Sequence, residues 1–320
     1  MKKDALSSKI DQIDLKILKE LDENCRQSLN VIGKKVRLSK EAVSKRISKL
    51  EKENVILGYH AVIDPSAIGY RFHRFYLKFQ GTGREDEMRI LGYIQSLPQT
   101  WFLGRISEKY DASWMVLYRS QEELHELWDA FTWKFARFLL SVESAPYYEA
   151  IHYPYPFPNA AKRNALVVGG KDGAVKVDEK DVRILAAFAT DGRIRFTTLA
   201  SKVGLNPLSL KKRTERLKDE GVILGFRPTI DFAKFGWEYR KLDVFLSDKK
   251  AENLSLSVIQ SHPNLVYIDK TIGSADIEAE FFIEPDEFES LLSELKDKCG
   301  SMLRTYDSFR ITQVLTLRYF

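Results

Sequence analysis

A short segment of this chain places lysine and serine side chains where they could bind the phosphates and base edges of DNA. If Val43, Ile47 and Leu50 face a core, the opposite face of a helix there presents ammonium and hydroxyl groups. Lysine neutralises phosphates or reaches guanine acceptors, and serine bonds to either without blocking the groove. The side chains of this candidate DNA-binding face belong to Ser39, Lys40, Ser44, Lys45, Arg46, Ser48 and Lys49.

A second segment offers similar chemistry later in the chain. Its candidate DNA-binding side chains belong to Ser209, Lys211, Lys212, Arg213 and Arg216. Glu215 adds a negative charge where the first segment has Ser48, so the second face is the weaker candidate. Because exposed helices commonly carry lysines, a module that contacts only other proteins stays an alternative for both segments.

Three carboxylates alternate along a predicted strand in the last quarter of the chain. Asp276, Glu278 and Glu280 should project from one face of this strand, while the intervening apolar side chains project from the other. A cationic ligand could use this stripe, and ion pairs with strand neighbours such as Lys270 are the more common alternative. No recognised motif ties these carboxylates to a His, Cys or Lys, so we predict no catalytic residues.

An internal repeat positions these candidate residues. Residues 14–18 (Asp-Leu-Lys-Ile-Leu) recur as residues 181–185 (Asp-Val-Arg-Ile-Leu), and the match continues without a gap to Gly69 and Gly236. The following segments match more faintly, with Tyr110-Asp111 answering Ala275-Asp276. Such a match predicts a duplicated folding unit, because core positions and turn residues must be kept together.

Each copy begins with the pattern of a helix-turn-helix module. In the first copy, apolar residues at helical spacing predict a helix that ends near Asn24 and a short second helix over residues 29–36. Ser39 is the predicted N-cap of the third helix, and the second copy uses Asn206 followed by Pro207 at the first helical position. The β-branched run over residues 55–63 predicts a strand or wing after this module.

The rest of each copy reads strand, helix, strand, strand, helix, strand, which is the ferredoxin-like order. The predicted elements of the first copy are 72–79, 88–97, 101–106, 112–118, 122–139 and 142–153. Those of the second copy are 242–246, 254–261, 266–271, 277–283, 287–298 and 306–319. The predicted fold is therefore α+β: a winged helix-turn-helix followed by a ferredoxin-like βαββαβ domain, duplicated in one chain.

The predicted domains alternate in charge. The helix-turn-helix domains are 1–63 and 178–230, the ferredoxin-like domains are 64–153 and 231–320, and a proline-rich linker spans 154–177. Residues 1–60 hold 14 Lys and Arg against 9 Asp and Glu, and residues 178–237 hold 12 against 8, within a net charge of +5. Clustered positive charge is typical of domains that bind phosphate backbones.

The composition predicts a cytoplasmic globular protein without a membrane span or secretory signal. Cys25 and Cys299 stand in no metal-binding pattern, so we expect free thiols, no metal and no cofactor. One helical stripe is aromatic, and we expect it to pack on a sheet or partner domain, with a heme or porphyrin pocket as the alternative. Its residues are Trp128, Phe131, Thr132, Trp133, Phe135 and Phe138.

Several of these motifs together resemble the signature of the Lrp/AsnC (feast/famine) family of transcription regulators. In the first copy they are Asp14-x-x-Ile17-Leu18, Arg46-x-x-x-Leu50-Glu51-x-Glu53-x-Val55-Ile56, Gly58 and Asp64-Pro65-x-x-x-Gly69. In the second they are Asp181, Arg213, Leu217, Glu220-Gly221-Val222-Ile223, Gly225, Asp231 and Gly236, with Phe232 in place of the proline. The resemblance covers nearly the whole chain, twice.

The resemblance implies a sequence-specific regulator whose N-terminal modules bind double-stranded DNA and whose ferredoxin-like RAM domains dimerise and often bind an amino acid. One chain is then expected to hold an intramolecular pseudo-dimer, which can assemble further into a homo-oligomer. The family's effector region surrounds a Gly-x-x-Asp turn, which matches Gly273-Ser274-Ala275-Asp276. The first copy keeps Asp111 but has Glu108 in place of the glycine, so a turn without a ligand is the simpler expectation there.

Two other functions stay open at this point. Fused pairs of Lrp/AsnC-like domains also resemble siroheme decarboxylases of heme biosynthesis, which are enzymes that bind a tetrapyrrole. The segment that carries a histidine in that group is here Ser107-Glu108-Lys109-Tyr110-Asp111, without His, and we therefore do not expect an enzyme. A third alternative is an assembly module whose helix-turn-helix copies no longer contact DNA.

Overall fold

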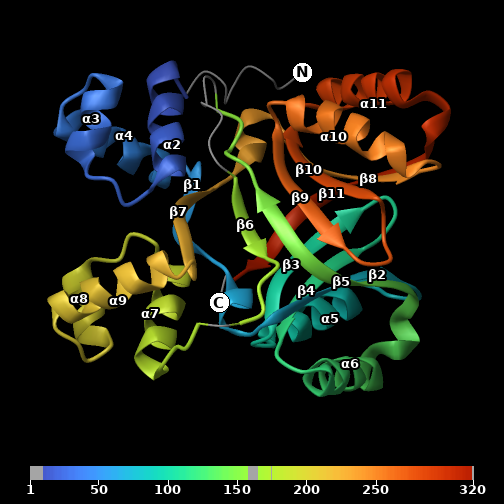
Figure 1. Cartoon of the computed structure of the whole chain (residues 1–320), viewed down its shortest axis with the longest axis horizontal. Coiled ribbons are helices and arrows are strands. Elements are labelled where there is room, and N and C mark those ends of the chain that lie inside the picture. The colour runs from blue at the N-terminus through green and yellow to red at the C-terminus, as the bar shows by residue number, and fades with distance from the viewer. Residues whose placement is uncertain (1–9, 158–164, 174, 319–320) are drawn as a thin grey trace.

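A computed structural model describes residues 10–157, 165–173 and 175–318 of the chain (Figure 1). Each copy opens with three helices and a strand, as predicted. In the first copy these are α2 (Gln12–Glu23), α3 (Leu29–Val36), α4 (Lys40–Lys52) and β1 (Ile56–Ile63). In the second copy they are α7 (Glu179–Thr190), α8 (Phe196–Lys202), α9 (Pro207–Asp219) and β7 (Ile223–Ile230). We call α2–α4 head one and α7–α9 head two.

The ferredoxin-like order is confirmed in both copies. The first contains β2 (Arg71–Phe79), α5 (Arg84–Ser96), β3 (Thr100–Ser107), β4 (Ala112–Tyr118), α6 (Gln121–Phe135) and β5 (Leu139–His152). The second contains β8 (Glu238–Leu246), α10 (Glu252–Ser261), β9 (Leu265–Thr271), β10 (Ile277–Ile283), α11 (Pro285–Cys299) and β11 (Leu303–Leu317). The predicted end of the last strand at Tyr319 lies outside the described residues.

The two ferredoxin-like domains share one closed sheet. Strand order in the described chain is β2-β4-β3-β11-β8-β10-β9-β5, and β5 pairs again with β2, so these eight strands form a ring. The long strands β5 and β11 close the ring, because each pairs with strands of both copies. The sequence predicted a pseudo-dimer, and this shared sheet is what joins its halves.

Each strand of the ring has an apolar outer face and a more polar inner face. Phe75 and Leu77 of β2 pack outward in a core with α5 and α6, and Leu242 and Val244 of β8 do the same with α10 and α11. Side chains alternate along a strand, so the residues between them point into the ring. This alternation places the charged side chains of these strands on the inner face of the ring.

The predicted wing pairs with its counterpart in the other copy. β1 runs antiparallel to β7 in a two-stranded ribbon, with His60 opposite Arg227. Figure 1 shows this ribbon between the two heads, with the closed sheet and its outer helices on the other side of the molecule. A wing strand can pair within its own module as part of a hairpin. Here β1 pairs instead with β7, the equivalent strand of the other copy.

The predicted linker contributes to the fold. Residues 166–169 form β6 (Leu166–Gly169), which extends the sheet beside β5, and the side chains of Tyr155 and Phe157 are buried. Pro154 and Pro156 therefore flank buried aromatic side chains, and the described parts of the linker pack on the rest of the fold. The exact domain boundaries stay predictions.

Three further expectations can be compared with the structure. Cys25 and Cys299 are buried free thiols, as predicted. Phe131, Phe135 and Phe138 pack on the sheet, but Trp133 is 91% exposed, so the expectation for that residue was wrong. No helix among the described residues is long and apolar enough to cross a membrane.

Candidate nucleic-acid interface and central cavity

The third helix of each head begins at the predicted cap. The Ser39 side chain accepts a hydrogen bond from the Ala42 backbone N–H (3.2 Å), and that of Asn206 accepts one from Ser209 (2.8 Å). These bonds satisfy N–H groups that the helix itself leaves unpaired. The caps therefore fix where α4 and α9 start and which face each helix turns outward.

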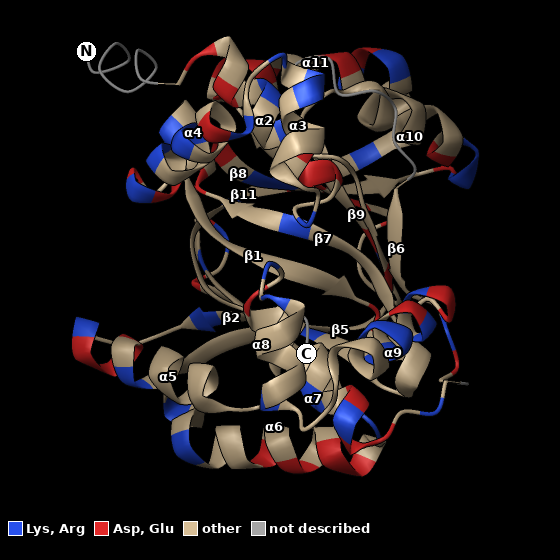
Figure 2. Cartoon of the chain, turned by 90° about the vertical axis from the view of Figure 1, so that its left-hand side faces the viewer, with Lys and Arg blue, Asp and Glu red and all other residues tan. Residues whose placement is uncertain are grey.

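The outer face of α4 is basic and accessible. Lys40, Lys45, Ser48 and Lys49 are exposed and Ser44 is half-buried, whereas Val43, Ile47 and Leu50 are buried. On α9, Lys211 and Lys212 are exposed, and Glu215 lies 3.7 Å from the Lys211 ammonium group. In Figure 2 the heads lie at opposite ends of one side of the molecule, with β1 and β7 between them.

The three candidate DNA-binding arginines bind carboxylates of their own copies. Arg46 donates to the carboxylates of Asp11 and Asp14, both at 2.7 Å, and thereby ties α4 to the start of α2. Arg213 repeats this with Asp178 and Asp181 at 2.8 Å. Arg216 also bonds to Asp181 at 2.5 Å. These guanidinium groups hold the recognition helices in place, and contact with DNA through them stays a prediction.

Contacts between the heads are buried and asymmetric. Arg26 donates to the backbone carbonyl of Gly192 at 2.7 Å and lies over the ring of Phe196. Asp22 and Arg227 form a buried ion pair at 2.6 Å. The repeat places Ala189 and His60 at the corresponding positions, so this ion pair exists on one side only. Burial and, to a smaller extent, the charge of Arg227 lower the pKa of His60 to about 3, so the imidazole is neutral.

The predicted effector turn joins β9 and β10. Gly273 has a positive φ of 80°, and Glu108 adopts the same left-handed conformation (φ 84°) in the first copy. Asp276 accepts from the backbone of Leu246 at 2.8 Å, and Asp111 accepts from that of Phe79 at 2.7 Å. Both aspartates thus stabilise their turns, and effector binding by Gly273, Ser274, Ala275, Asp276 and Asp111 stays a prediction.

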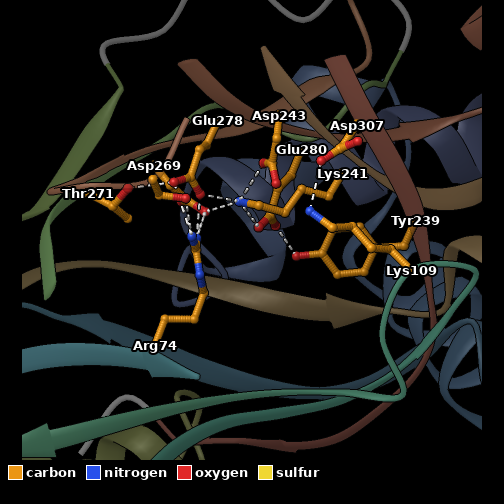
Figure 3. Close-up of polar contacts among 11 residues, drawn as sticks. Arg74, Lys109, Tyr239, Lys241, Asp243, Asp269, Thr271, Glu278, Glu280 and Asp307 are labelled. Carbon is orange, nitrogen blue, oxygen red and sulfur yellow. Dashed lines mark hydrogen bonds and ion pairs between the residues drawn. The ribbon is translucent and has the colours of Figure 1, made fainter. Parts of the chain in front are cut away.

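Glu278 and Glu280 of the predicted carboxylate stripe lie together on the inner face of β10, whereas Asp276 precedes the strand and binds the Leu246 backbone, and the partners of the stripe differ from those expected. Glu278 is bound by Arg74, which reaches across from the first copy, and lies 3.0 Å from the Lys241 ammonium group (Figure 3). Lys270 pairs instead with Glu149. Sequence reasoning missed Arg74 and Lys241; the signal was charged residues alternating with apolar ones along strands that are otherwise buried.

A central cavity of about 1040 Å³ lies inside the closed sheet and extends to the β1–β7 ribbon. Arg74, Lys241, Asp269 and Glu280 line it on the sheet side, and His60 lines it on the ribbon side. Side chains of both copies therefore meet in one space. No group of His, Cys, Asp and Glu among the described residues is arranged to hold a metal ion.

The AsnC-type helix-turn-helix domain matches this chain twice, over residues 10–51 and 177–218. The HTH-type transcriptional regulator LrpB of Bacillus subtilis is 32% identical over 120 residues, which are 37% of this chain and 78% of that protein. The chain belongs to the Lrp/AsnC family. An HTH-type transcriptional regulator of Pyrococcus horikoshii is 53% identical over 60 residues, 19% of this chain. The chain spans only 39% of that relative's length.

Solved structures of a two-copy protein resemble this Lrp/AsnC chain over both copies. The siroheme decarboxylase NirDL superposes with a TM-score of 0.65 at 13% identity, covering 97% of this chain and 94% of that one. At this identity the likeness shows a common fold alone. It supports the arrangement of two heads and two ferredoxin-like domains in a single polypeptide.

Proposed function

We propose that this chain is a sequence-specific DNA-binding transcription regulator. The observation that carries the proposal is the pair of AsnC-type heads, each presenting a capped third helix with cations on its exposed face. Lysines on such a face neutralise phosphates, and the serines are short enough to let the helix enter a major groove. Head one is the stronger reader, because α9 carries Glu215 where α4 carries Ser48.

The ribbon supports a two-site mode of binding. β1 and β7 connect the heads through paired backbones, and Arg26 adds contacts from head one to head two. Two heads related by an internal repeat would read two half-sites of one DNA duplex, as dimeric helix-turn-helix proteins do. The chain would thus bind a single operator without a second polypeptide.

An effector is part of the proposal. We infer that a small molecule, with an amino acid as the family's usual class, regulates DNA binding near the turn from Gly273 to Asp276. Gly273 and Ser274 are exposed there. Adding amino acids to the binding assay described next tests this part by itself.

Selection from a random DNA library by the full-length protein, followed by binding measurements at several salt concentrations, tests the main proposal. We expect a discrete enriched sequence and an affinity that falls steeply between about 50 and 200 mM salt. Lys45→Glu should weaken binding about tenfold or more and lower the salt slope by about 1. The matched change in head two, Lys212→Glu, should have a smaller effect. Lys250→Glu, far from both heads, is the control.

Absence of any enriched sequence at low salt would exclude the proposal. Equal affinity of the wild-type protein and Lys45→Glu would exclude α4 as the reading helix. Equal effects of Lys45→Glu and Lys212→Glu would instead show that the two heads contribute alike.

A decarboxylase function is the rival proposal, since NirDL has the same fold and His60 and His152 line the central cavity. Residue choice argues against it, because the segment that carries a histidine in siroheme decarboxylases is here Ser107-Glu108-Lys109-Tyr110-Asp111, without His. Absorbance titration with siroheme separates the two functions: a stoichiometric complex would favour the enzyme.

A further inference from the structure

The interior of the closed sheet is built asymmetrically. A ring of eight strands has an interior that side chains just fill, or that holds one small ligand. The repeat keeps a cation at one position in both copies, Arg74 in the first and Lys241 in the second. The register of the strands is the same in both copies, because Arg74 stands opposite Met115 and Lys241 opposite Glu280. Positions can therefore be compared pair by pair.

Four interior positions are acidic in the second copy and uncharged in the first. The second copy has Asp243, Asp269, Glu278 and Glu280, where the first has Tyr76, Gly104, Ser113 and Met115. Three of the four acids form a continuous row across neighbouring strands, since Glu278 stands opposite both Asp243 and Asp269. These acids thus lie on one wall, where Arg74 and Lys241 are their cationic partners.

The two interior cations leave this wall with an excess of negative charge. Arg74 binds Glu278, and Lys241 lies 2.7 Å from Asp269 and 3.0 Å from Glu278. Asp243 is only 4% exposed, and its Oδ1 makes no hydrogen bond among the described residues; the Lys241 ammonium group is 3.9 Å away. Glu280 accepts from the Tyr239 hydroxyl and lies 3.4 Å from Lys241 (Figure 3).

Asp243 and Glu280 are the groups that this excess affects. Burial raises the pKa of Asp243 to about 7 and that of Glu280 to about 8, and neighbouring carboxylates act in the same direction. Burying either carboxylate in its charged form costs free energy. Near neutral pH that cost is removed when the carboxyl group holds a proton, and it is reduced when a cation lies beside the carboxylate. The charged and titratable groups packed around them are Arg74, Lys241, Asp269, Glu278 and Tyr239, and Asp307 stands opposite Asp243 on β11, where it pairs with Lys109.

The rest of the cavity suits an organic cation. Tyr147, Tyr239 and Tyr267 line it, and the faces of aromatic rings attract ammonium groups. Lys241 already occupies the space among the carboxylates, which leaves a poor geometry for a metal ion. A volume of about 1040 Å³ is ample for an aliphatic amine.

We propose that the central cavity binds a small organic amine, with Glu280 as its principal carboxylate and the tyrosine rings around its carbon chain. The cavity lining includes no residue of the turn from Gly273 to Asp276, although Arg74 donates a hydrogen bond to the Ser274 hydroxyl at 3.4 Å. Because the cavity reaches Gly58 and His60 of the ribbon, an amine bound there would contact the segment that joins the heads. Binding itself requires no DNA, so it can be measured independently of the proposed function.

Calorimetric titration of the full-length protein with 1,5-diaminopentane tests the site, with glutarate as a control of similar length and opposite charge. We expect one saturable diamine site per chain, protons released on binding, and an affinity that rises from about pH 6 to about pH 9 as the carboxyls ionise. Glu280→Gln should weaken diamine binding about tenfold or more. Glu289→Gln, an exposed acid on α11, should leave it unchanged.

A second variant guards against misfolding of the first. Met115→Trp fills the cavity without removing a charge and should abolish diamine binding; thermal unfolding checks that both variants fold. Three outcomes would overturn the proposal: no saturable binding at about 1 mM diamine, stronger binding of glutarate than of diamine, or full affinity in folded Glu280→Gln. A protein that binds the diamine but selects no DNA would retain this site and lose the proposed function.

Discussion

Charged residues of this chain act according to what surrounds them. Arg46 keeps 28% of its side chain exposed, yet both of its ion pairs tie one helix to another within head one. Breaking such a contact leaves Asp14, which is fully buried, without its main partner. The sequence contained the signal, because Asp14 and Arg46 recur together as Asp181 and Arg213. An aspartate and an arginine that recur together in both copies can indicate an ion pair within the module as well as a DNA-binding arginine.

The raised pKa of Glu280 predicts how stability depends on pH. Burial holds its proton up to about pH 8, whereas the unfolded side chain loses it near its ordinary value of 4.5. The folded state therefore binds more protons between these values, so this group's stabilisation is present below about pH 4 and is lost as pH rises towards 8. The slope reaches about 1.4 kcal/mol per pH unit for one such group.

Urea unfolding at a series of pH values checks this prediction. Glu280→Gln, which cannot ionise, should show a flatter decline than the wild-type protein between about pH 5 and pH 8. The exposed change Glu289→Gln should follow the wild-type curve. Parallel curves for wild type and Glu280→Gln would mean that Glu280 titrates normally in the folded protein.

At the scale of elements, local chemistry predicted the helices well and long-range pairing poorly. The caps at Ser39 and Asn206 mark helix starts because a side chain and a nearby backbone N–H decide them. The bounds of β4 and β10 were also predicted correctly. The partner of β1 was not, since pairing with β7 depends on a strand 167 residues later and on the fold of the whole chain.

The difference between α4 and α9 predicts a gain of DNA binding. Glu215→Ser gives head two the residue that head one has at Ser48, removes a negative charge from the candidate interface and frees Lys211 from its neighbour at 3.7 Å. One repulsive charge near a phosphate costs about 1 kcal/mol, so affinity should rise about fivefold at low salt.

Binding isotherms on the selected DNA check this gain. Glu289→Ser makes the same change on α11 and should alter affinity little. If Glu215→Ser binds no more tightly than wild type, the outer face of α9 does not approach the DNA backbone.

The whole molecule is held together by features that no single copy contains. The ring closes only because β5 and β11 each pair with strands of both copies, which leaves neither ferredoxin-like domain with its own open sheet edge. The acidic wall inside the ring likewise depends on Arg74 from the other copy. A sequence read one domain at a time cannot show either feature, because each arises where the halves meet.

The buried ion pair between Asp22 and Arg227 should be the most sensitive link between the heads. It joins α2 of head one to β7 of the second copy, and neither side chain is more than 5% exposed. Arg227→Met alone should destabilise the chain by about 3–5 kcal/mol, because it leaves a buried carboxylate without its cation. Adding Asp22→Asn removes that stranded charge, keeps an oxygen acceptor for the buried Tyr155 N–H and should restore most of the loss.

Urea unfolding of the two single variants and the double variant completes this cycle. We expect the double variant to be more stable than Arg227→Met, with a coupling of about 0.5–3 kcal/mol. The exposed pair Arg183 and Glu179 provides the comparison, and its removal should change stability by less than about 1 kcal/mol. Simple additivity of the Asp22 and Arg227 changes would show that the pair does not hold the heads together. At the corresponding positions of the repeat the chain has His60 and Ala189, which cannot form such an ion pair and which line the central cavity. The buried ion pair therefore links the heads on one side of the ribbon only.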